Sequence, residues 1–443
     1  MKLACVLAIA AGCTGENIGY TPLLGPQHWT IGLGGFSDDS PAVDGVAFAP
    51  DGNVVVTGIF RNTVDFGSGA RTTKNPLGSV FVSKRSIVDG SEIWTNVIGA
   101  DADTGRWVTG AKIDSSGNIV IAGREGVDED FGGITLPVAD GQGFVAKYDG
   151  DGHLLWARSF GGNNGAIEGD SIAISSDDSI TVAGLCYGNT YSLPFHAAQT
   201  APGWIVHLAP DGTPLWDATT PTQIDRIAAL RDGSFAIATS IDRTMSYAGE
   251  LLTAQSGRTP VVVHVSATGT IDRAATYGDP NVMYMYPSLV ASGDGFATAT
   301  SAWPNDDETL SRPHVTGVDS NGRIAWNAEA ASGPANPFAI AAAPSGALLV
   351  GGRMSYVADF GNGTIHGATY IASYAPDGSF MDVRAYGAAT NEGNDAIRGL
   401  AISPSGAVAF VGIVADQLDF GTGPVTTHGD WDVVVGLISP PSN

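Results

Sequence analysis

Four Asp-Phe-Gly triplets are the first residues in this sequence that could carry chemistry. They begin at Asp65, Asp130, Asp359 and Asp419. In a protein kinase this triplet holds Mg²⁺. Here the sequence has neither the phosphate loop nor the catalytic loop of a kinase. We therefore interpret the triplet as a turn in which Asp accepts backbone N–H bonds, Phe packs between neighbouring repeat units and Gly lets the chain reverse.

Acidic residues in the longer loops are the second candidate. Asp101 and Asp103, followed by Gly105, are spaced like the start of a calcium-binding loop, but the third carboxylate and the distal Glu are absent. We name Asp101 and Asp103 as a candidate calcium site, with solvated, turn-capping aspartates as the alternative. The other acidic loop residues are Asp38, Asp39, Asp44, Asp128, Glu129, Asp130, Glu168, Asp170, Glu392 and Asp395.

Two histidines raise the question of a transition metal. His207 and His264 occupy the same position of a repeated strand as Lys84 and Lys147. A position that accepts either Lys or His is a polar strand position, and neighbouring repeats would hold such residues too far apart to share one zinc ion. No His-x-x-x-His or Cys-x-x-Cys spacing occurs. We predict no zinc site.

The sequence shows no pattern of an activated nucleophile or a cofactor loop. It has no G-x-S-x-G motif and no Walker or Rossmann glycine signature. We therefore predict no catalytic residue and no cofactor other than the candidate calcium. A carboxylate pair for glycoside cleavage stays open, because 45 acidic residues offer many pairs and the sequence does not select one.

The elements that would position these residues follow an internal repeat. A turn followed by a strand of small and β-branched residues recurs about every 60 residues. The aligned turn positions are Gly52, Gly117, Asp178, Gly233, Asp294, Gly346 and Gly406. Each of these seven units contains four short strand-like runs; in the second unit they lie near 108–113, 119–122, 144–148 and 154–160. Four-stranded units in series predict an all-β, seven-bladed β-propeller of antiparallel blades, with a solenoid as the competitor.

The two ends of the chain decide between ring and solenoid. The seventh unit stops after its third strand, DVVVGLIS. The missing strand is found at 28–35, where HWTIGLGG aligns with LWARSFGG at 155–162 and places Trp29 opposite Trp156. We predict that this N-terminal strand completes the last blade and so protects an edge that would otherwise aggregate.

A tryptophan recurs at one position of the fourth strand. It is Trp94, Trp156, Trp216 and Trp326, with Arg273 in its place in the fourth unit. A fixed blade position predicts packing between blades rather than a sugar-binding platform. Three tryptophans outside this position are candidates for exposed contacts with a ligand, namely Trp107, Trp303 and Trp431.

Together, the turn, the VVVTG-type strand, the DFG hairpin, the FVAK-type strand, the LLW run and the FGG end resemble the bacterial seven-bladed β-propeller repeat family, known as SBBP-type repeats. The resemblance covers about 27–443, and units four and five depart furthest from it. It implies an exported or surface-attached bacterial protein. It brings no catalytic residues to this sequence.

Charge and composition limit the partners. Asp and Glu number 45 against 21 Lys and Arg, for a net charge of −24. A protein that binds nucleic acid or an anionic membrane needs a basic face, so we expect no nucleic-acid partner for this acidic chain. The N-terminus, MKLACVLAIAAGC, has an apolar run too short to span a bilayer, ending in small residues before Cys13. This ending resembles a bacterial lipobox, with a soluble export signal as the alternative.

We therefore expect a lipoprotein signal peptide at 1–12, a tether at 13–26 and the propeller at 27–443, with a lipid on Cys13. Thr14 lacks the aspartate of inner-membrane retention, which favours an outer-membrane lipoprotein facing the periplasm or the cell surface. Cys186 then has no disulfide partner. The expected function is a non-enzymatic binding or scaffolding role towards an envelope protein or a surface polysaccharide. The alternatives are a glycan-active propeller enzyme and a calcium-dependent adhesin, and fold alone does not choose among them.

Overall fold

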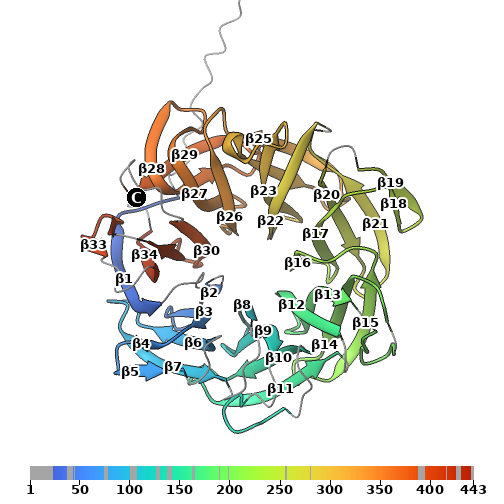
Figure 1. The fold of residues 1–443 in the computed structure, drawn as a ribbon, viewed down its shortest axis with the longest axis horizontal. Helices are drawn as coiled ribbons and strands as arrows, with labels where there is room; N and C mark the ends of the chain where they lie inside the picture. Colours follow the sequence, from blue (N-terminus) through green and yellow to red (C-terminus); the bar gives the residue numbers. More distant parts are fainter. Residues whose placement is uncertain are drawn as a thin grey trace, which may run out of the picture.

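Seven β-sheets form a ring around a central opening (Figure 1). The structure is a computed structural model that describes residues 23–36, 43, 45–73, 78–99, 107–125, 130–136, 142–161, 165–188, 190–197, 199–254, 257–279, 281–387, 395–415, 417–425 and 431–440. Each sheet has four antiparallel strands, and the first strands of neighbouring blades contact one another all around the ring. The predicted all-β, seven-bladed β-propeller is confirmed. We name the strands of a blade a to d from the axis outward.

Blades 1 to 4 follow the order of the chain. Blade 1 is β2 (Gly45–Phe48), β3 (Val54–Phe60), β6 (Ser79–Arg85) and β7 (Glu92–Ile98). Blade 2 is β8 (Trp107–Ile113), β9 (Ile119–Glu125), β10 (Gln142–Tyr148) and β11 (Leu154–Phe160). Blade 3 is β12 (Gly165–Ile174), β13 (Ile180–Gly188), β14 (Gly203–Leu208) and β15 (Pro214–Thr220). Blade 4 is β16 (Arg226–Ala229), β17 (Phe235–Ile241), β20 (Thr259–Val265) and β21 (Ile271–Thr276).

Blades 5 to 7 complete the ring. Blade 5 is β22 (Val282–Ser292), β23 (Gly295–Pro304), β24 (Arg312–Val318) and β25 (Ile324–Glu329), and blade 6 is β26 (Ala335–Ala342), β27 (Leu348–Asp359), β28 (Thr364–Tyr374) and β29 (Phe380–Tyr386). Blade 7 is β30 (Ala396–Ile402), β31 (Val408–Val414), β34 (Trp431–Ile438) and β1 (Gln27–Phe36). The remaining elements are three hairpins, β4 (Thr63–Asp65) with β5 (Ala70–Thr72), β18 (Met245–Tyr247) with β19 (Glu250–Leu252) and β32 (Leu418–Asp419) with β33 (Pro424–Val425), and the 3₁₀ turn η1 (Glu308–Leu310).

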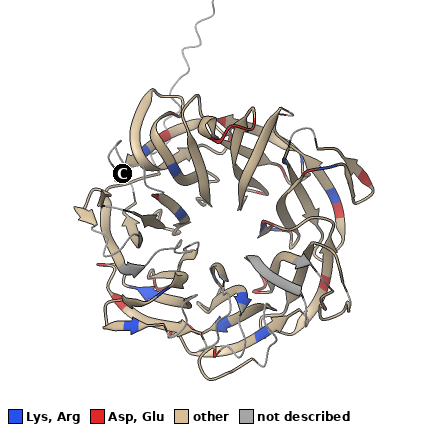
Figure 2. Cartoon of the chain, viewed as in Figure 1, with Lys and Arg blue, Asp and Glu red and all other residues tan. Residues whose placement is uncertain are grey.

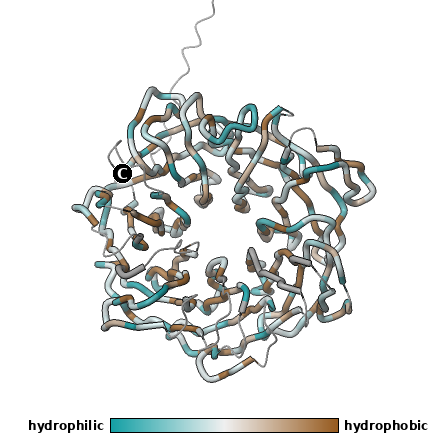
Figure 3. The backbone as a smooth tube through the Cα atoms, in the orientation of Figure 1, coloured by the Kyte–Doolittle hydropathy of each residue, from teal (hydrophilic) through white to brown (hydrophobic). Residues whose placement is uncertain are grey.

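The middle strands are apolar on both faces because each blade is covered by a blade on either side. All residues of β3 and β6 are buried, whereas β7 at the rim mixes buried, half-buried and exposed positions. The core is accordingly divided into seven clusters, each formed between two adjacent blades. Figure 3 shows the same distribution, with hydrophobic segments in every blade around the ring.

The N-terminal strand closes the ring as predicted. β1 pairs antiparallel with β34, and Trp29 lies opposite Leu437. Trp29 and Leu33 join the core cluster between blades 7 and 1. The residues just before β1 are held against blade 6, because the Arg384 guanidinium of β29 donates to the carbonyls of Leu24 and Gly25.

A latch from the outer strand to the next blade recurs at all seven junctions of the described ring. Each donor reaches a carbonyl in the c–d turn, or the equivalent position, of the following blade. The pairs are Trp29 with Ile87 (2.9 Å), Trp94 with Gly150 (3.2 Å), Trp156 with Pro210 (3.2 Å), Trp216 with Ala267 (3.0 Å), Arg273 with Asn321 (2.6 Å), Trp326 with Pro376 (2.9 Å) and Arg384 with Leu24 (2.5 Å). The prediction of tryptophan packing between blades is confirmed.

The turn that receives each tryptophan needs glycine. Gly378 has φ +85°, and a Cβ there would lie 2.4 Å from the Trp326 ring. Gly152 has φ +89°, and a Cβ there would lie 3.0 Å from Trp94. A left-handed backbone that must also lie against an indole admits only glycine.

Candidate functional site

The Asp-Phe-Gly triplets are turns, as interpreted from the sequence. In the first triplet, Asp65 Oδ1 accepts the N–H groups of Gly67 (2.8 Å) and Gly69 (3.0 Å). Phe66 is buried and packs edge-on against Phe60. Asp130, Asp359 and Asp419 accept two glycine N–H groups in the same way, and Phe131, Phe360 and Phe420 are buried.

A polar position recurs in strand c of four blades and holds Lys84, Lys147, His207 and His264. Lys147 Nζ lies 2.8 Å from Asp114 Oδ2 in the a–b turn of its own blade and donates to the Pro210 carbonyl of the next blade (3.0 Å). Burial would raise the pKa of Asp114, but hydrogen bonds from Lys147 and Asn118 hold it below its usual value. Lys84 repeats the arrangement with Asp51 (2.7 Å) and Gly150 (3.0 Å). Lys84 and Lys147 therefore link the strands of their own blade to the next blade.

Several sequence-predicted site residues lie outside the described part of the chain. These are Cys13, Asp101 and Asp103, and also Asp38, Asp39, Asp44, Asp128, Glu129 and Glu392. Within the residues that are described, no three His, Cys, Asp or Glu side chains come together as metal ligands would. Across the same residues, no helix is long and apolar enough to span a bilayer. Cys186 is half-buried in β13, and burial raises the pKa of its thiol, which favours the unreactive protonated form.

A Ser-His-Asp arrangement that the sequence did not reveal joins the a–b turn of blade 4 to its strands c and d. His264 Nε2 is 3.0 Å from Ser234 Oγ, and His264 Nδ1 is 2.6 Å from Asp272 Oδ1. The Ser234 hydroxyl is buried and donates to Asp232 (2.5 Å). Ser179 makes the same bond in blade 3, to Asp177 at 2.6 Å. Because its proton is engaged by Asp232 and its oxygen does not line the adjacent cavity, Ser234 is a turn residue rather than a nucleophile.

That cavity occupies the junction of blades 4 and 5, where Arg273 replaces the tryptophan of the latch. It measures about 490 Å³ and is lined by His264, Asp272, Arg273 and Phe296 among others. A guanidinium is smaller than an indole, so the substitution leaves space that tryptophan fills elsewhere. The junction also has the smallest of the seven core clusters.

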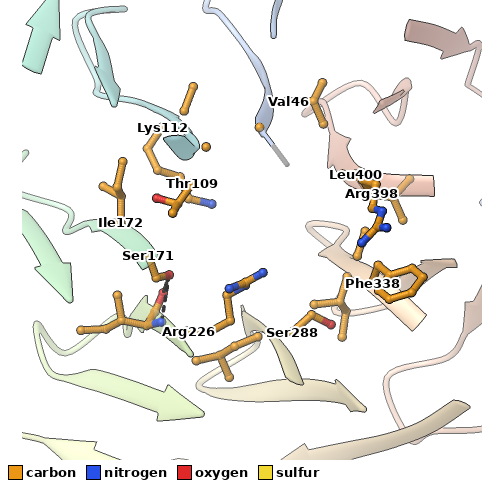
Figure 4. Close-up of a pocket in the computed structure, with 18 residues that line it drawn as sticks. Val46, Thr109, Lys112, Ser171, Ile172, Arg226, Ser288, Phe338, Arg398 and Leu400 are labelled. Atoms are coloured by element: carbon orange, nitrogen blue, oxygen red, sulfur yellow. Dashed lines mark hydrogen bonds between the residues drawn. The ribbon is translucent and has the colours of Figure 1, made fainter. Parts of the chain in front are cut away.

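The axial pocket is the site to which all seven blades contribute. It measures about 110 Å³ and is lined by residues of β2, β8, β12, β16, β22, β26 and β30. Three of its side chains are basic: Lys112, Arg226 and Arg398 (Figure 4). None of the lining residues that the structure describes is Asp or Glu. Figure 2 shows basic positions on the inner strands around the opening of this strongly acidic protein.

Each cation of this pocket is held differently. Arg226 Nη1 donates to the carbonyl of Asp225 (2.7 Å), and burial raises the pKa of the Asp225 carboxyl. The Arg398 guanidinium lies 4.3 Å from the centre of the Phe338 ring, in cation–π contact. Lys112 makes no hydrogen bond or ion pair with any residue of the described chain. The Lys112 side chain is accessible to solvent only through the axial opening and has protein on its other sides. These surroundings remove much of its hydration, and together with the positive charge of Arg226 they lower the pKa of Lys112.

The fold and this pocket define the chain as a seven-bladed β-propeller whose form suits a binding or scaffolding role. Neither a protein-family model nor a curated protein sequence matches it. Among solved structures, a protein of unknown function from Bacteroides caccae is 14% identical, with 69% of this chain and 94% of that chain covered and a TM-score of 0.38. A protein of unknown function from Dyadobacter fermentans is 8% identical, with 94% and 98% covered and a TM-score of 0.43.

A third similar structure is an enzyme. The quinohemoprotein alcohol dehydrogenase from Comamonas testosteroni is 12% identical, with 95% of this chain and 77% of that chain covered and a TM-score of 0.41. At such identities a likeness concerns the course of the chain and carries no activity across. Membership of the SBBP-type repeat family stays a prediction.

Proposed function

We propose that this protein is a non-enzymatic binding or scaffolding lipoprotein of a bacterial cell envelope, tethered through Cys13. Its partner is an envelope protein or a surface polysaccharide. The observation that most directly supports this proposal is the axial pocket. All seven blades contribute residues to its lining, and its charged lining residues are all basic. A surface built from many strands of a rigid ring suits recognition.

The charge of the pocket favours binding over glycan cleavage. Glycoside hydrolysis uses two carboxyl groups that face the scissile bond. The described lining of the axial pocket has Lys112, Arg226 and Arg398 but no carboxylate. The Ser-His-Asp arrangement around Ser234 also lacks an available nucleophile, as described above. Both observations support a role without chemistry.

Affinity capture tests the proposal. The purified protein is immobilised through its C-terminus and exposed to solubilised envelope of the source bacterium, then eluted with a chelator and afterwards with salt. A discrete protein or polysaccharide in the salt eluate is expected. Elution by chelator alone would favour the calcium-dependent adhesin, and shortened glycan in the flow-through would favour the enzyme. Empty eluates with unchanged glycan would overturn the proposal.

The tether has its own test. Labelled palmitate should enter the wild-type protein and not the Cys13→Ser variant in the native host. In cell fractionation, we expect the wild-type protein in the outer-membrane fraction and the variant in the soluble periplasm or the medium. A variant that still takes up label and stays in the membrane would overturn lipidation at Cys13.

A further inference from the structure

Inner strands of the propeller are irregular where they line the axial pocket. Register shifts against the partner strand occur beside the pocket-lining residues in five of these seven strands, namely β8, β12, β22, β26 and β30. In β26 the unpaired residue is Phe338, and in β30 it is Arg398. A bulge turns one extra side chain out of the regular alternation and is typical of strands beside functional sites. The Arg398–Phe338 contact is thus made by two bulge residues of neighbouring blades.

Aromatic rings extend outward from this contact. The Phe338 ring centre lies 5.7 Å from that of Tyr286, and the Tyr286 ring centre lies 6.3 Å from that of Trp303. The Trp303 indole N–H donates to Ser301 Oγ (3.2 Å), which fixes its orientation. We call Phe338, Tyr286 and Trp303 the aromatic arc. It runs from the axial pocket toward the ends of β22 and β23 that carry the d–a and b–c connections.

Tyr286 is held in an unfavourable backbone conformation. Its φ is +55°, within the β22 irregularity, and its side chain is 47% exposed. A bulky residue at positive φ costs free energy that glycine would avoid. Because the ring is so exposed, its contacts with Phe338 and Trp303 recover only part of this cost. Such strain at an exposed aromatic beside a pocket points to a role in binding.

Positive charge and aromatic faces therefore both border the axial pocket. The net charge of the chain is −24, so this cluster is a local exception that attracts an anionic group. Lys112 and Arg226 repel each other, which a bound anion would relieve. The space among the cations, about 110 Å³, takes one charged end group and not a whole drug-sized ligand. The remainder of a ligand must lie outside, over the aromatic arc.

We propose that the axial site binds a carboxylated sugar end-on. Its carboxylate enters among Lys112, Arg226 and Arg398, and the apolar C–H face of its ring lies against the aromatic arc. This inference rests on the proposed binding function and names its ligand class. The sugar is either a free sugar acid or the terminal uronate of a polysaccharide, and both present the same chemistry to the site.

Titration calorimetry with the purified protein separates these cases. The probes are glucuronate and galacturonate, a short oligogalacturonate, and glucose, acetate and inorganic phosphate as references. Binding of the uronates and not of glucose is expected, with acetate at least about tenfold weaker, because it lacks the ring face; this factor equals about 1.4 kcal/mol. Oligomer binding tighter than monomer binding identifies a polysaccharide end, and equal affinities identify a free sugar acid.

Matched variants assign the effect to the site. Lys112→Gln should weaken uronate binding at least about tenfold, because a hydrogen-bonded ion pair is lost. Arg231→Gln is its control: it removes the same charge from a solvent-exposed pair with Asp294 and should leave affinity unchanged. Tyr286→Gly should weaken binding while leaving the melting temperature unchanged or raised. Tyr356→Gly removes a second exposed tyrosine at positive φ (+65°) and should not affect binding.

Each contrary result has a defined meaning. Equal binding of acetate, phosphate and uronate would reduce the site to a simple anion site and overturn the sugar. Uronate binding unaffected by both Lys112→Gln and Tyr286→Gly would place it elsewhere and overturn the axial assignment. No uronate binding, combined with successful capture of an envelope partner, would overturn this inference and leave the proposed function standing. Failure of capture as well would overturn both.

Discussion

The rim and the axis of this propeller follow opposite rules. At the rim, every junction carries the same kind of latch, in which an outer-strand Trp or Arg donates to a carbonyl of the next blade. At the axis, the inner strands place different residues around the opening, with Lys112 from one blade, Arg226 from another and Phe338 from a third. Repetition stabilises the ring, and departure from repetition builds the pocket. Positions that repeat should therefore matter for stability, and positions that differ should matter for binding.

Removing the closing strand should break the rim most severely. Deletion of 27–36 takes β1 from blade 7, exposes the edge of β34 and removes Trp29 and Leu33 from the core. An unpaired edge templates aggregation. We expect loss of the monomer peak in size-exclusion chromatography and a melting temperature lower by more than about 10 °C. A monomeric deletion variant that melts with the wild type would contradict ring closure by this strand.

Breaking one buried ion pair should cost less. In Asp114→Ala, Lys147 remains buried without its counter-charge, since the two side chains are 5% and 2% exposed. Removing one partner of such a pair costs about 3–5 kcal/mol. Urea unfolding measures the change. Arg231→Gln, in an exposed pair, is the control and should cost less than about 0.5 kcal/mol.

A comparison of two tryptophans addresses rim and axis directly. Trp156→Ala deletes a latch and its packing against Gly212, and we expect a loss of about 2–3 kcal/mol. Trp303→Ala removes a partly exposed ring of the aromatic arc, and we expect a loss below about 1 kcal/mol. Urea unfolding of both variants is the measurement. Equal losses would show that the division between rim and axis is wrong.

The polar position of strand c predicts a pH dependence that differs between blades. Burial lowers the pKa of His207, which stacks on Trp216, although Asp177 opposes this. The unfolded chain therefore takes up its proton first, so stability is full above about pH 6.5 and falls as pH drops through the lowered folded pKa. Asp114, with a lowered pKa, instead keeps its contribution until pH falls below about 4. The urea midpoint should drop slightly between pH 7 and 5, and less so in His207→Gln.

The smallest effect on stability should come from the axis itself. Lys112 has only a repulsive partner, Arg226, among the described residues. Lys112→Gln should change the free energy of unfolding by no more than about 0.5 kcal/mol, and the direction expected is stabilising. A loss above about 2 kcal/mol would mean that Lys112 is a structural residue, which would contradict the contrast between rim and axis.

The repeat made most of the ring predictable. Strand periodicity placed the fourth strand of unit two at 154–160, the bounds that β11 has in the structure. The Trp position and the DFG turns were also readable, because each depends on contacts fixed by the repeat. The latch from blade 6 to blade 7 could not be predicted in this way, because its donor, Arg384, lies two residues beyond the position that holds Trp in other blades. A change of residue type and place together leaves no repeat to align.

The sequence by itself determined the class of fold, the number of blades and the strand that closes the ring. These follow from local pattern, since each unit encodes the same strands and turns. Only the tertiary structure brought Lys112, Arg226 and Arg398 to one opening, because they come from three blades far apart in the chain. Their positions within the strands also differ, since Arg398 is a bulge residue of β30, whereas Lys112 pairs regularly with Val120 in β8. Convergence on an axis is a property of the closed ring, and no single repeat contains it.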